Sequence, residues 1–291
     1  MKAAIGRRGL LAGGAAVLGS AALGAPALAK GREEVDVVVA AGSMTAPSSI
    51  PQGVVTFRVR SSGPALSVVF LRLRSGVTID TYLGHLAKVS SKDPEVRKAA
   101  AKAIEEAADG LGGAVVTAQI PVTFTQIIAP GRYHLISFDY QNPDVAPVVR
   151  EIAVKGASPG RYPAGVATIA LWQSGTRTRF AVTGPRLPAR GRYLVVNGSD
   201  GLNEVVFMPV KPGTTAAELQ AAFDAFREGK QPPSMPFIGQ PTGLAPLSPG
   251  YVAVLETSLT AGLYALWTYM PDPRTGLPRA WDGAFTLITL T

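Results

Sequence analysis

The sequence predicts an all-β protein built from two tandem β-sandwiches, each interrupted by a short helical insertion. Short apolar runs separated by turns fill most of the chain, which contains 32 Gly and 24 Pro in 291 residues. This pattern is typical of sandwiches, in which many short strands are joined by tight turns. A spaced set of core and turn residues also occurs twice, which indicates that one sandwich is repeated along the chain.

The duplication is visible in two pairs of motifs. Ile50-Pro51, Val68-Val69-Phe70 and Gly76 recur 137 positions later as Leu187-Pro188, Val205-Val206-Phe207 and Gly213. The segment Pro130-Gly131-Arg132-Tyr133-His134-Leu135 has its counterpart 131 positions later in Ala261-Gly262-Leu263-Tyr264-Ala265-Leu266. The six-residue difference predicts a loop or helix that is longer in the first copy.

The first 29 residues have the features of an export signal. Lys2 and Arg7-Arg8 form a basic segment, residues 9–25 form a weakly apolar run, and Ala27-Leu28-Ala29 is a small-x-small cleavage site. Glycines interrupt the run, which is shorter than the roughly 20 apolar residues of a membrane span. We therefore expect export to the periplasm, the cell wall or the medium, by the twin-arginine route that Arg7-Arg8-Gly9-Leu10-Leu11 resembles. We expect no transmembrane helix in the mature chain.

The remaining chain suits two domains. Removal of the signal leaves 262 of the 291 residues, and we expect domains over 30–155 and 166–291 joined by a Gly- and Pro-rich linker over 156–165. The formal net charge of +8 includes Lys2, Arg7 and Arg8, so the mature chain is too weakly basic for a nucleic-acid-binding protein. The chain has no cysteine, so its stability must come from burial rather than from disulfides.

The first domain begins with alternating and buried strands. Val55, Phe57 and Val59 alternate with polar residues over 54–60, which predicts a strand with one hydrated face. Residues 66–73 are almost continuously apolar, as in a strand inside a sandwich. Thr78 is suited to cap a helix over 79–88, and Asp93-Pro94 opens a second helix that ends near Ala108 before Gly110. Further strands are expected over 35–39, 115–128, 131–140 and 148–154.

The second domain repeats this plan. A helix is expected over 215–228, a turn at Asn197-Gly198 and a Pro- and Gly-rich loop over 231–250. Its strands are expected over 168–173, 178–182, 193–197, 204–210, 251–259, 262–270 and 284–290.

These motifs resemble the cupredoxin fold, the Greek-key sandwich of the small blue copper proteins. They are closer still to secreted bacterial proteins that carry tandem cupredoxin-like domains without copper. The resemblance rests on three features: the strand with Ile-Pro or Leu-Pro that leads to Val-Val-Phe, the helix inserted after Val-Val-Phe, and the strand Gly-x-Tyr-x-Leu. It covers nearly the whole mature chain and implies a metal-binding end in each ancestral domain.

Blue copper requires two imidazoles and a thiolate. The resemblance places the positions of the family's first histidine, cysteine and second histidine at Leu66, Ser137 and Tyr140 in the first copy. In the second copy they fall at Asn203, Thr268 and Pro271. None of these residues supplies the required ligand, so we expect no copper, no other metal and no cofactor.

Catalytic signatures are weak. Gly156-Ala157-Ser158-Pro159-Gly160 matches the G-x-S-x-G pattern, but Pro159 follows the serine and both histidines of the chain, His85 and His134, precede it. The segment is more typical of a linker, and the two histidines are more typical of surface positions. Residues 200–204 contain oxygen ligands without the spacing of a calcium loop, so a hairpin turn is favoured there.

Two groups of residues are candidates for binding. One is a patch for an anionic ligand, and the other is an aromatic contact surface on a loop. The patch consists of Arg177, Arg179, Arg186, Arg190 and Arg192, and the contact surface consists of Trp267, Tyr269 and Trp281. Core packing of Trp267 is an equally good interpretation.

The sequence therefore favours an exported, non-catalytic binding or scaffolding protein of the cell envelope or extracellular space, with an envelope polymer or a protein as its partner. An enzyme is the first alternative, with Asp139, Asp144, Asp272 or Asp282 as its carboxylates. Two carboxyl groups that face each other across a pocket would favour that reading. The second alternative is a structural or oligomer-forming protein, which predicts an apolar patch or an exposed sheet edge.

Overall fold

The computed structural model describes residues 33–291 apart from 64, 140–141, 143–144, 158–159 and 184–185. The expected signal, Ser158, Tyr140 and Asp144 therefore lie outside the described residues. No helix in the described part of the chain is long and apolar enough to cross a membrane.

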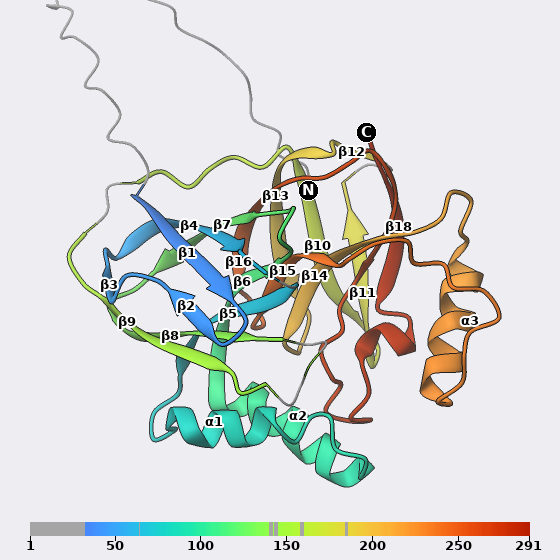
Figure 1. The fold of residues 1–291 in the computed structure, drawn as a ribbon, viewed down its shortest axis with the longest axis horizontal. Helices are drawn as coiled ribbons and strands as arrows, with labels where there is room; N and C mark the ends of the chain where they lie inside the picture. The colour runs from blue at the N-terminus through green and yellow to red at the C-terminus, as the bar shows by residue number, and fades with distance from the viewer. Residues whose placement is uncertain (1–32, 64, 140–141, 143–144, 158–159, 184–185) are drawn as a thin grey trace, which may run out of the picture. The chain divides into compact units, whose positions relative to one another are not determined.

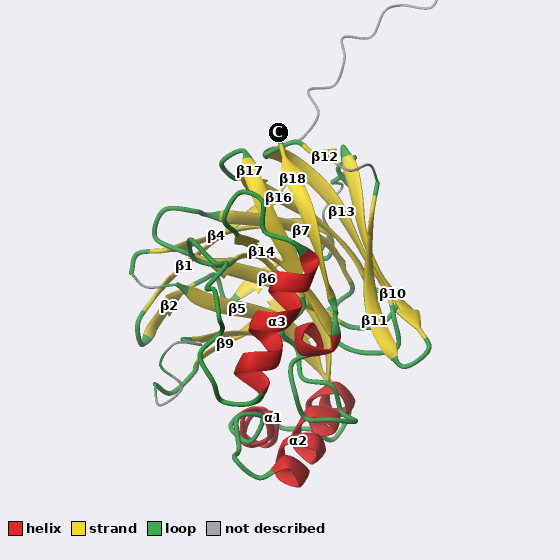
Figure 2. Ribbon diagram, turned by 90° about the vertical axis from the view of Figure 1, so that its right-hand side faces the viewer, coloured by secondary structure: helices red, strands yellow, loops and turns green. Residues whose placement is uncertain are grey.

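Two β-sheets face each other, with helices outside one of them (Figures 1 and 2). The first half of the chain contains β1 (Glu33–Ala40), β2 (Ser43–Thr45), β3 (Ser49–Ile50), β4 (Gly53–Ser61), β5 (Leu66–Leu73), α1 (Ile79–Leu86), α2 (Pro94–Ala107), β6 (Ala108–Val116), β7 (Val122–Ile128), β8 (Gly131–Phe138) and β9 (Val148–Val154). The second half contains β10 (Ala167–Ser174), β11 (Arg177–Val182), β12 (Arg186–Leu187), β13 (Arg190–Gly198), β14 (Asn203–Pro209), α3 (Ala216–Arg227), β15 (Thr242–Leu247), β16 (Val252–Ser258), β17 (Gly262–Trp267), the 3₁₀ helix η1 (Arg279–Asp282) and β18 (Phe285–Leu290).

The two halves have the same strand order. In the eight-stranded sheet, β2-β1-β4-β7 is followed in reverse by β16-β13-β10-β11, and in the ten-stranded sheet β3-β9-β8-β5-β6 is followed in reverse by β15-β14-β17-β18-β12. Antiparallel pairing of β7 with β16 and of β6 with β15 makes both sheets continuous across the halves. The all-β, duplicated sandwich with a helical insertion in each copy is therefore confirmed. The domain boundaries at 155 and 166 stay a prediction.

The core lies between the sheets and continues outside them beneath the helices. Val55, Phe57 and Val59 are fully buried, as their alternation predicts, and Phe57 stacks on Phe124 at 4.7 Å. Within β5, Val68 and Phe70 join the inner core, whereas Val69 and Leu71 face outward beneath α1 and α2. Outward residues of β14 and β17 pack beneath α3 in the same way. The helical insertions therefore cover the outer face of the ten-stranded sheet.

The sequence prediction was wrong for the two strands that join the halves in this sheet. β6 begins at Ala108, where the helix was expected to end, and reaches only the first two residues of the strand expected over 115–128. β15 lies inside the expected Pro- and Gly-rich loop. Gly113 and Gly243 explain the error, because both have positive φ and a Cβ at either would lie about 2 Å from the carbonyl oxygen of Val68 or Val205. The close backbone approach requires glycine, which in a sequence indicates a turn.

Three other local predictions can be compared with the structure. The helix starts are confirmed, since the Thr78 hydroxyl and the Asp93 carboxylate accept backbone N–H groups of α1 and α2. The second helix ends at Ala107, close to the expected Ala108, but Gly110 lies within β6 and does not close the helix. Residues 199–202 do not form a hairpin turn, because they carry the chain from the eight-stranded sheet to the ten-stranded sheet.

Candidate functional site

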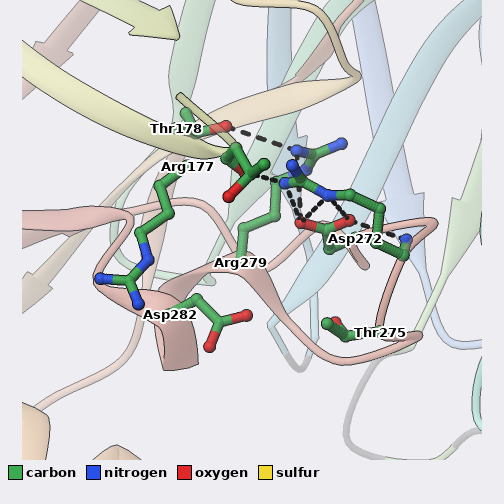
Figure 3. Close-up of a pocket in the computed structure, with 8 residues that line it drawn as sticks. Arg177, Thr178, Asp272, Thr275, Arg279 and Asp282 are labelled. Atoms are coloured by element: carbon green, nitrogen blue, oxygen red, sulfur yellow. Dashed lines mark hydrogen bonds and ion pairs between the residues drawn. The ribbon is translucent and has the colours of Figure 1, made fainter. Parts of the chain in front are cut away.

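A cavity of about 280 Å³ opens between the edge strand β11 and the segment around η1 (Figure 3). Its volume is just below the roughly 300–1,000 Å³ of most small-molecule sites, so it suits a small ligand. Three guanidinium groups, two carboxylates and three threonines line it. These residues are Thr176, Arg177 and Thr178 from β11 and the turn before it, and Asp272, Arg274, Thr275, Arg279 and Asp282 from the other side.

Arg279 is the buried charge of this cavity, with 4% of its surface exposed. Its Nη2 donates to Glu105 of α2 at 2.9 Å, and its Nη1 lies 3.4 Å from the hydroxyl of Thr178. Glu105 also accepts the N–H of Leu202, so one carboxylate of the first half anchors two segments of the second. Gly201 makes room for the ion pair, since a Cβ there would lie 2.1 Å from Nη2. The Nε of Arg279 is buried and has no hydrogen-bond partner among the described residues.

Asp272 is also buried and lies between two arginines. Its Oδ1 accepts from the backbone N and the Nε of Arg274, at 2.8 and 2.9 Å, and its Oδ2 lies 3.9 Å from Arg279. Burial opposes ionisation of Asp272, but the hydrogen bonds from Arg274 and the charge of Arg279 outweigh it and lower its pKa. By contrast, burial raises the pKa of Glu105 although Arg279 and the Leu202 N–H oppose the rise. The arginines therefore stabilise the ionised form of Asp272.

Asp282 is held on the opposite wall by α3. The Nη2 of Arg227 lies 2.8 Å from Oδ1 of Asp282, and the side-chain amide of Gln220 donates to the carbonyl of Trp281. Arg179 of β11 donates to the carbonyls of Asp282 and Gly283. The strand β11, the helix α3 and η1 thus fix each other around the cavity.

The structure divides the five arginines expected to form a patch. By their alternation along the strands, four of them belong to the outer face of the eight-stranded sheet: Arg177, Arg179, Arg190 and Arg192. They are not close together, because Arg177 pairs with Ser174 at one end of β10 and Arg192 lies beside the other end of β10. Seven residues of strand, roughly 23 Å at 3.3 Å each, separate these ends. Only Arg177 and Arg179 lie at the cavity.

The remaining members of the patch differ in their surroundings. Arg192 lies 3.5 Å from Glu256, whereas Arg190 is exposed. Arg186 begins β12, and its side chain lies outside the described residues.

The three aromatic residues separate into core and surface. Trp267 is 7% exposed and packs on Phe223 and Phe237, while Tyr269 is 43% exposed and accepts a hydrogen bond from Trp281 Nε1 at 3.2 Å. Trp267 is therefore a core residue, and of these three residues Tyr269 and Trp281 reach the surface.

Glu204, which the sequence analysis considered only as part of a loop with oxygen ligands, lies next to Tyr269. Its Oε1 accepts the N–H of Tyr269 at 2.8 Å. Burial raises the pKa of Glu204 to about 7, although this hydrogen bond opposes the rise.

The positions equivalent to copper ligands do not fit copper. Leu66, Ser137, Asn203 and Thr268 are all buried, and none offers an imidazole or a thiolate. The cavity beside Leu66 and Ser137 measures only about 10 Å³, which is the size of a single water site. In the described part of the chain no three His, Cys, Asp or Glu side chains are grouped for a metal.

The other candidates for chemistry are scattered. His85 lies on α1, and His134 lies on β8, where burial lowers its pKa although Glu151 opposes this. Asp139 accepts from the backbone N and the side-chain amide of Asn142. Asp272 and Asp282 line one cavity, so the structure brings together one pair of the carboxylates considered for an enzyme.

Sequence reasoning missed Glu105, Arg274 and Arg279. Arg279 meets Glu105 across 174 residues, and no local pattern encodes that pairing. The only sequence signal was the concentration of charge around the turn 271–279, which also contains three prolines.

No protein-family model matches the chain, and no curated protein matches it. Among solved structures, auracyanin B has 19% identity over 45% of this chain and 93% of its own, with a TM-score of 0.27. Reduced auracyanin from the photosynthetic bacterium Roseiflexus castenholzii has 18% identity over 43% of this chain and 96% of its own, with a TM-score of 0.24. A multicopper oxidase has 11% identity over 91% of both chains, with a TM-score of 0.23. These overlaps are low, and we carry no copper chemistry from those proteins to this chain.

Proposed function

We propose that this protein is exported and acts, without copper and without catalysis, as a binding or scaffolding protein of the cell envelope or extracellular space. The basic and apolar segments of residues 1–29 support export. The cavity between β11 and η1 is the proposed place of contact with an envelope polymer or a partner protein.

The observation that carries this proposal is the pairing of charges in the cavity. Asp272 is bound by Arg274, Asp282 by Arg227, and Arg279 by Glu105. Among the described lining residues, Arg177 is the charged side chain that has no ion pair or hydrogen bond (Figure 3). Carboxylates paired with arginine are suited to maintaining a shape and a charge, whereas general acid catalysis needs a carboxyl group that is protonated near neutral pH. A fixed cavity with one free cation is suited to binding.

An enzyme remains the second candidate because Asp272 and Asp282 line the same cavity. Under that hypothesis one carboxylate would act as nucleophile or base on a bound substrate. The Asp272→Asn and Asp282→Asn variants separate the two functions. Loss of turnover of any envelope polymer in both variants, with ligand retention intact, would favour the enzyme.

A structural role is the third candidate. Three large apolar side chains on the outer face of the eight-stranded sheet are exposed: Ile127 by 61%, Val166 by 66% and Trp172 by 45%. Their alternation along the strands places them on that face. A stable oligomer that dissociates on Trp172→Ser substitution, measured by analytical ultracentrifugation, would favour this role.

The test of the proposed function combines localisation with retention. We expect the chain to be found outside the cytoplasm, and we expect Arg7→Lys together with Arg8→Lys to trap it inside. The exported chain should be retained on isolated cell wall or membrane, and salt should release it because the contact is electrostatic. Cytoplasmic location of the unmodified chain, or no retention on any fraction at low salt, would contradict the proposal.

A further inference from the structure

We infer that the cavity between β11 and η1 is a binding site for a phosphate-type oxyanion. This inference rests on the proposed binding function and names the chemistry of its ligand. It begins from the charge of the site, the hydrogen-bond donors that remain free there, and the size of the cavity.

The charge around the cavity is positive after the surrounding carboxylates are counted. Five arginines and four carboxylates lie in its lining or directly around it, which leaves one positive charge in excess. The arginines are Arg177, Arg179, Arg227, Arg274 and Arg279, and the carboxylates are Glu105, Asp200, Asp272 and Asp282. The two arginines without a carboxylate partner, Arg177 and Arg179, both lie on β11. The uncompensated charge is therefore held on a strand rather than on a mobile loop.

The donors that remain free are those that an oxyanion needs. The guanidinium of Arg177 has no partner among the described residues. Arg274 donates from Nε to Asp272 and from Nη2 to Asp272 and the Thr176 carbonyl, whereas its Nη1 has no acceptor among the described residues. Thr275 accepts the N–H of Leu277 at 3.2 Å, which leaves its own O–H available to donate. Guanidinium groups bind phosphate oxygens through charge-assisted hydrogen bonds, and hydroxyls also donate to them.

A second observation comes from the buried wall. The unpaired Nε of Arg279 is an N–H donor without an acceptor, in a side chain that is only 4% exposed. Such a group is costly unless an acceptor approaches it. An oxyanion in the adjoining cavity adds negative charge beside this guanidinium. The cavity volume of about 280 Å³ admits a phosphate group and part of what carries it.

The same chemistry has two sources, free phosphate and the phosphodiester of a wall polymer. The experiment is therefore isothermal titration calorimetry of the chain purified after export, with inorganic phosphate in one arm and poly(glycerol phosphate) in the other. We expect one phosphate-binding site per chain, with weaker binding as ionic strength rises from about 0.01 M to 0.15 M. Binding only in the polymer arm, if it depends on Arg177, would assign the polymer as the source.

Three variants make the test specific. Arg177→Gln should weaken binding about tenfold, which corresponds to about 1.4 kcal/mol. Arg190→Gln removes the same charge from an exposed position on the same face of the same sheet and should leave the affinity unchanged. Asp282→Asn removes a negative charge from the wall and should strengthen binding. Thermal unfolding of each variant confirms that the fold is retained.

No heat in either arm, or equal affinities for Arg177→Gln and Arg190→Gln, would overturn the inference. Retention of the exported chain on the envelope without phosphate binding would contradict the phosphate site but not the proposed function. Phosphate binding by a chain that stays in the cytoplasm would support the phosphate site but contradict the proposed function.

Discussion

Glu204 gives the structure a pH dependence that a single substitution should abolish. The carboxylate lies on β14 beneath Tyr269, where burial raises its pKa to about 7. Glu204→Gln keeps the size of the side chain and an oxygen that accepts the Tyr269 N–H, but removes the buried charge. The substitution therefore isolates the cost of ionising this group in the folded protein.

The direction and size of the change in stability with pH follow from the pKa of Glu204 in the folded and in the unfolded protein. The pKa of about 7 in the folded protein exceeds the ordinary glutamate pKa of 4.5, so the folded state binds the proton more tightly than the unfolded state between these values. Stability therefore falls as pH rises from about 4.5 to 7, and the full cost is present above pH 7. At 1.36 kcal/mol per pKa unit the difference is worth about 3 kcal/mol at most. Glu204→Gln should be more stable than wild type by up to that amount above about pH 8.

Urea denaturation at roughly pH 5 and pH 8.5 measures this effect. We expect the free energy of unfolding of Glu204→Gln to change much less between the two values than that of wild type. The exposed Glu106 of α2 supplies the control, since Glu106→Gln should keep the wild-type difference. If Glu204→Gln keeps the same difference as wild type, the account of the buried carboxylate is wrong.

The other predictions concern the join between the halves and the cavity wall. Gly113→Ala should destabilise the protein by more than about 2 kcal/mol, because the φ at this position is strained for alanine and the new Cβ meets a carbonyl oxygen. Gly84→Ala, in open space on α1, should stabilise the protein by roughly 0.5–1 kcal/mol. Equal effects of the two substitutions in urea denaturation would contradict this. Arg279→Met should cost about 3–5 kcal/mol because it leaves Glu105 without its cationic partner and leaves Asp272 with Arg274 alone. A cost below about 1 kcal/mol in the same assay would refute the role of the Arg279–Glu105 pair. The lowered pKa of Asp272 contributes stability that is present above the ordinary aspartate pKa of 3.8 and is lost as pH falls below it. Asp272→Asn should therefore flatten the decrease in thermal stability at acidic pH, and an unchanged decrease would count against the ion pair.

The predicted fold was accurate where local pattern determines structure. The alternation of Val55, Phe57 and Val59 predicted an inner face, and all three are fully buried. The repeated Val-Val-Phe and Gly-x-Tyr-x-Leu motifs predicted the same strands in both halves, where Tyr133 and Tyr264 donate their hydroxyl protons to carbonyls four residues upstream. Short-range rules suffice for such elements because the side chains that face the core follow the strand period.

The prediction failed where structure depends on contacts distant in sequence. β6 and β15 are strands because they pair with each other and with β5 and β14, and their glycines obscure that role in the sequence. The cavity was missed for the same reason. Of the five arginines chosen from their proximity in sequence, the structure places Arg177 and Arg179 at the cavity and Arg190 and Arg192 at the other end of the sheet.

The proposed function requires the free charge of the β11 cavity to bind an envelope component. This binding is measured by the fraction of exported chain retained on isolated cell wall and membrane at low ionic strength, for wild type, Arg177→Gln and Arg190→Gln. We expect Arg177→Gln to be released and Arg190→Gln to be retained like wild type. Equal retention of all three proteins would contradict binding through this cavity.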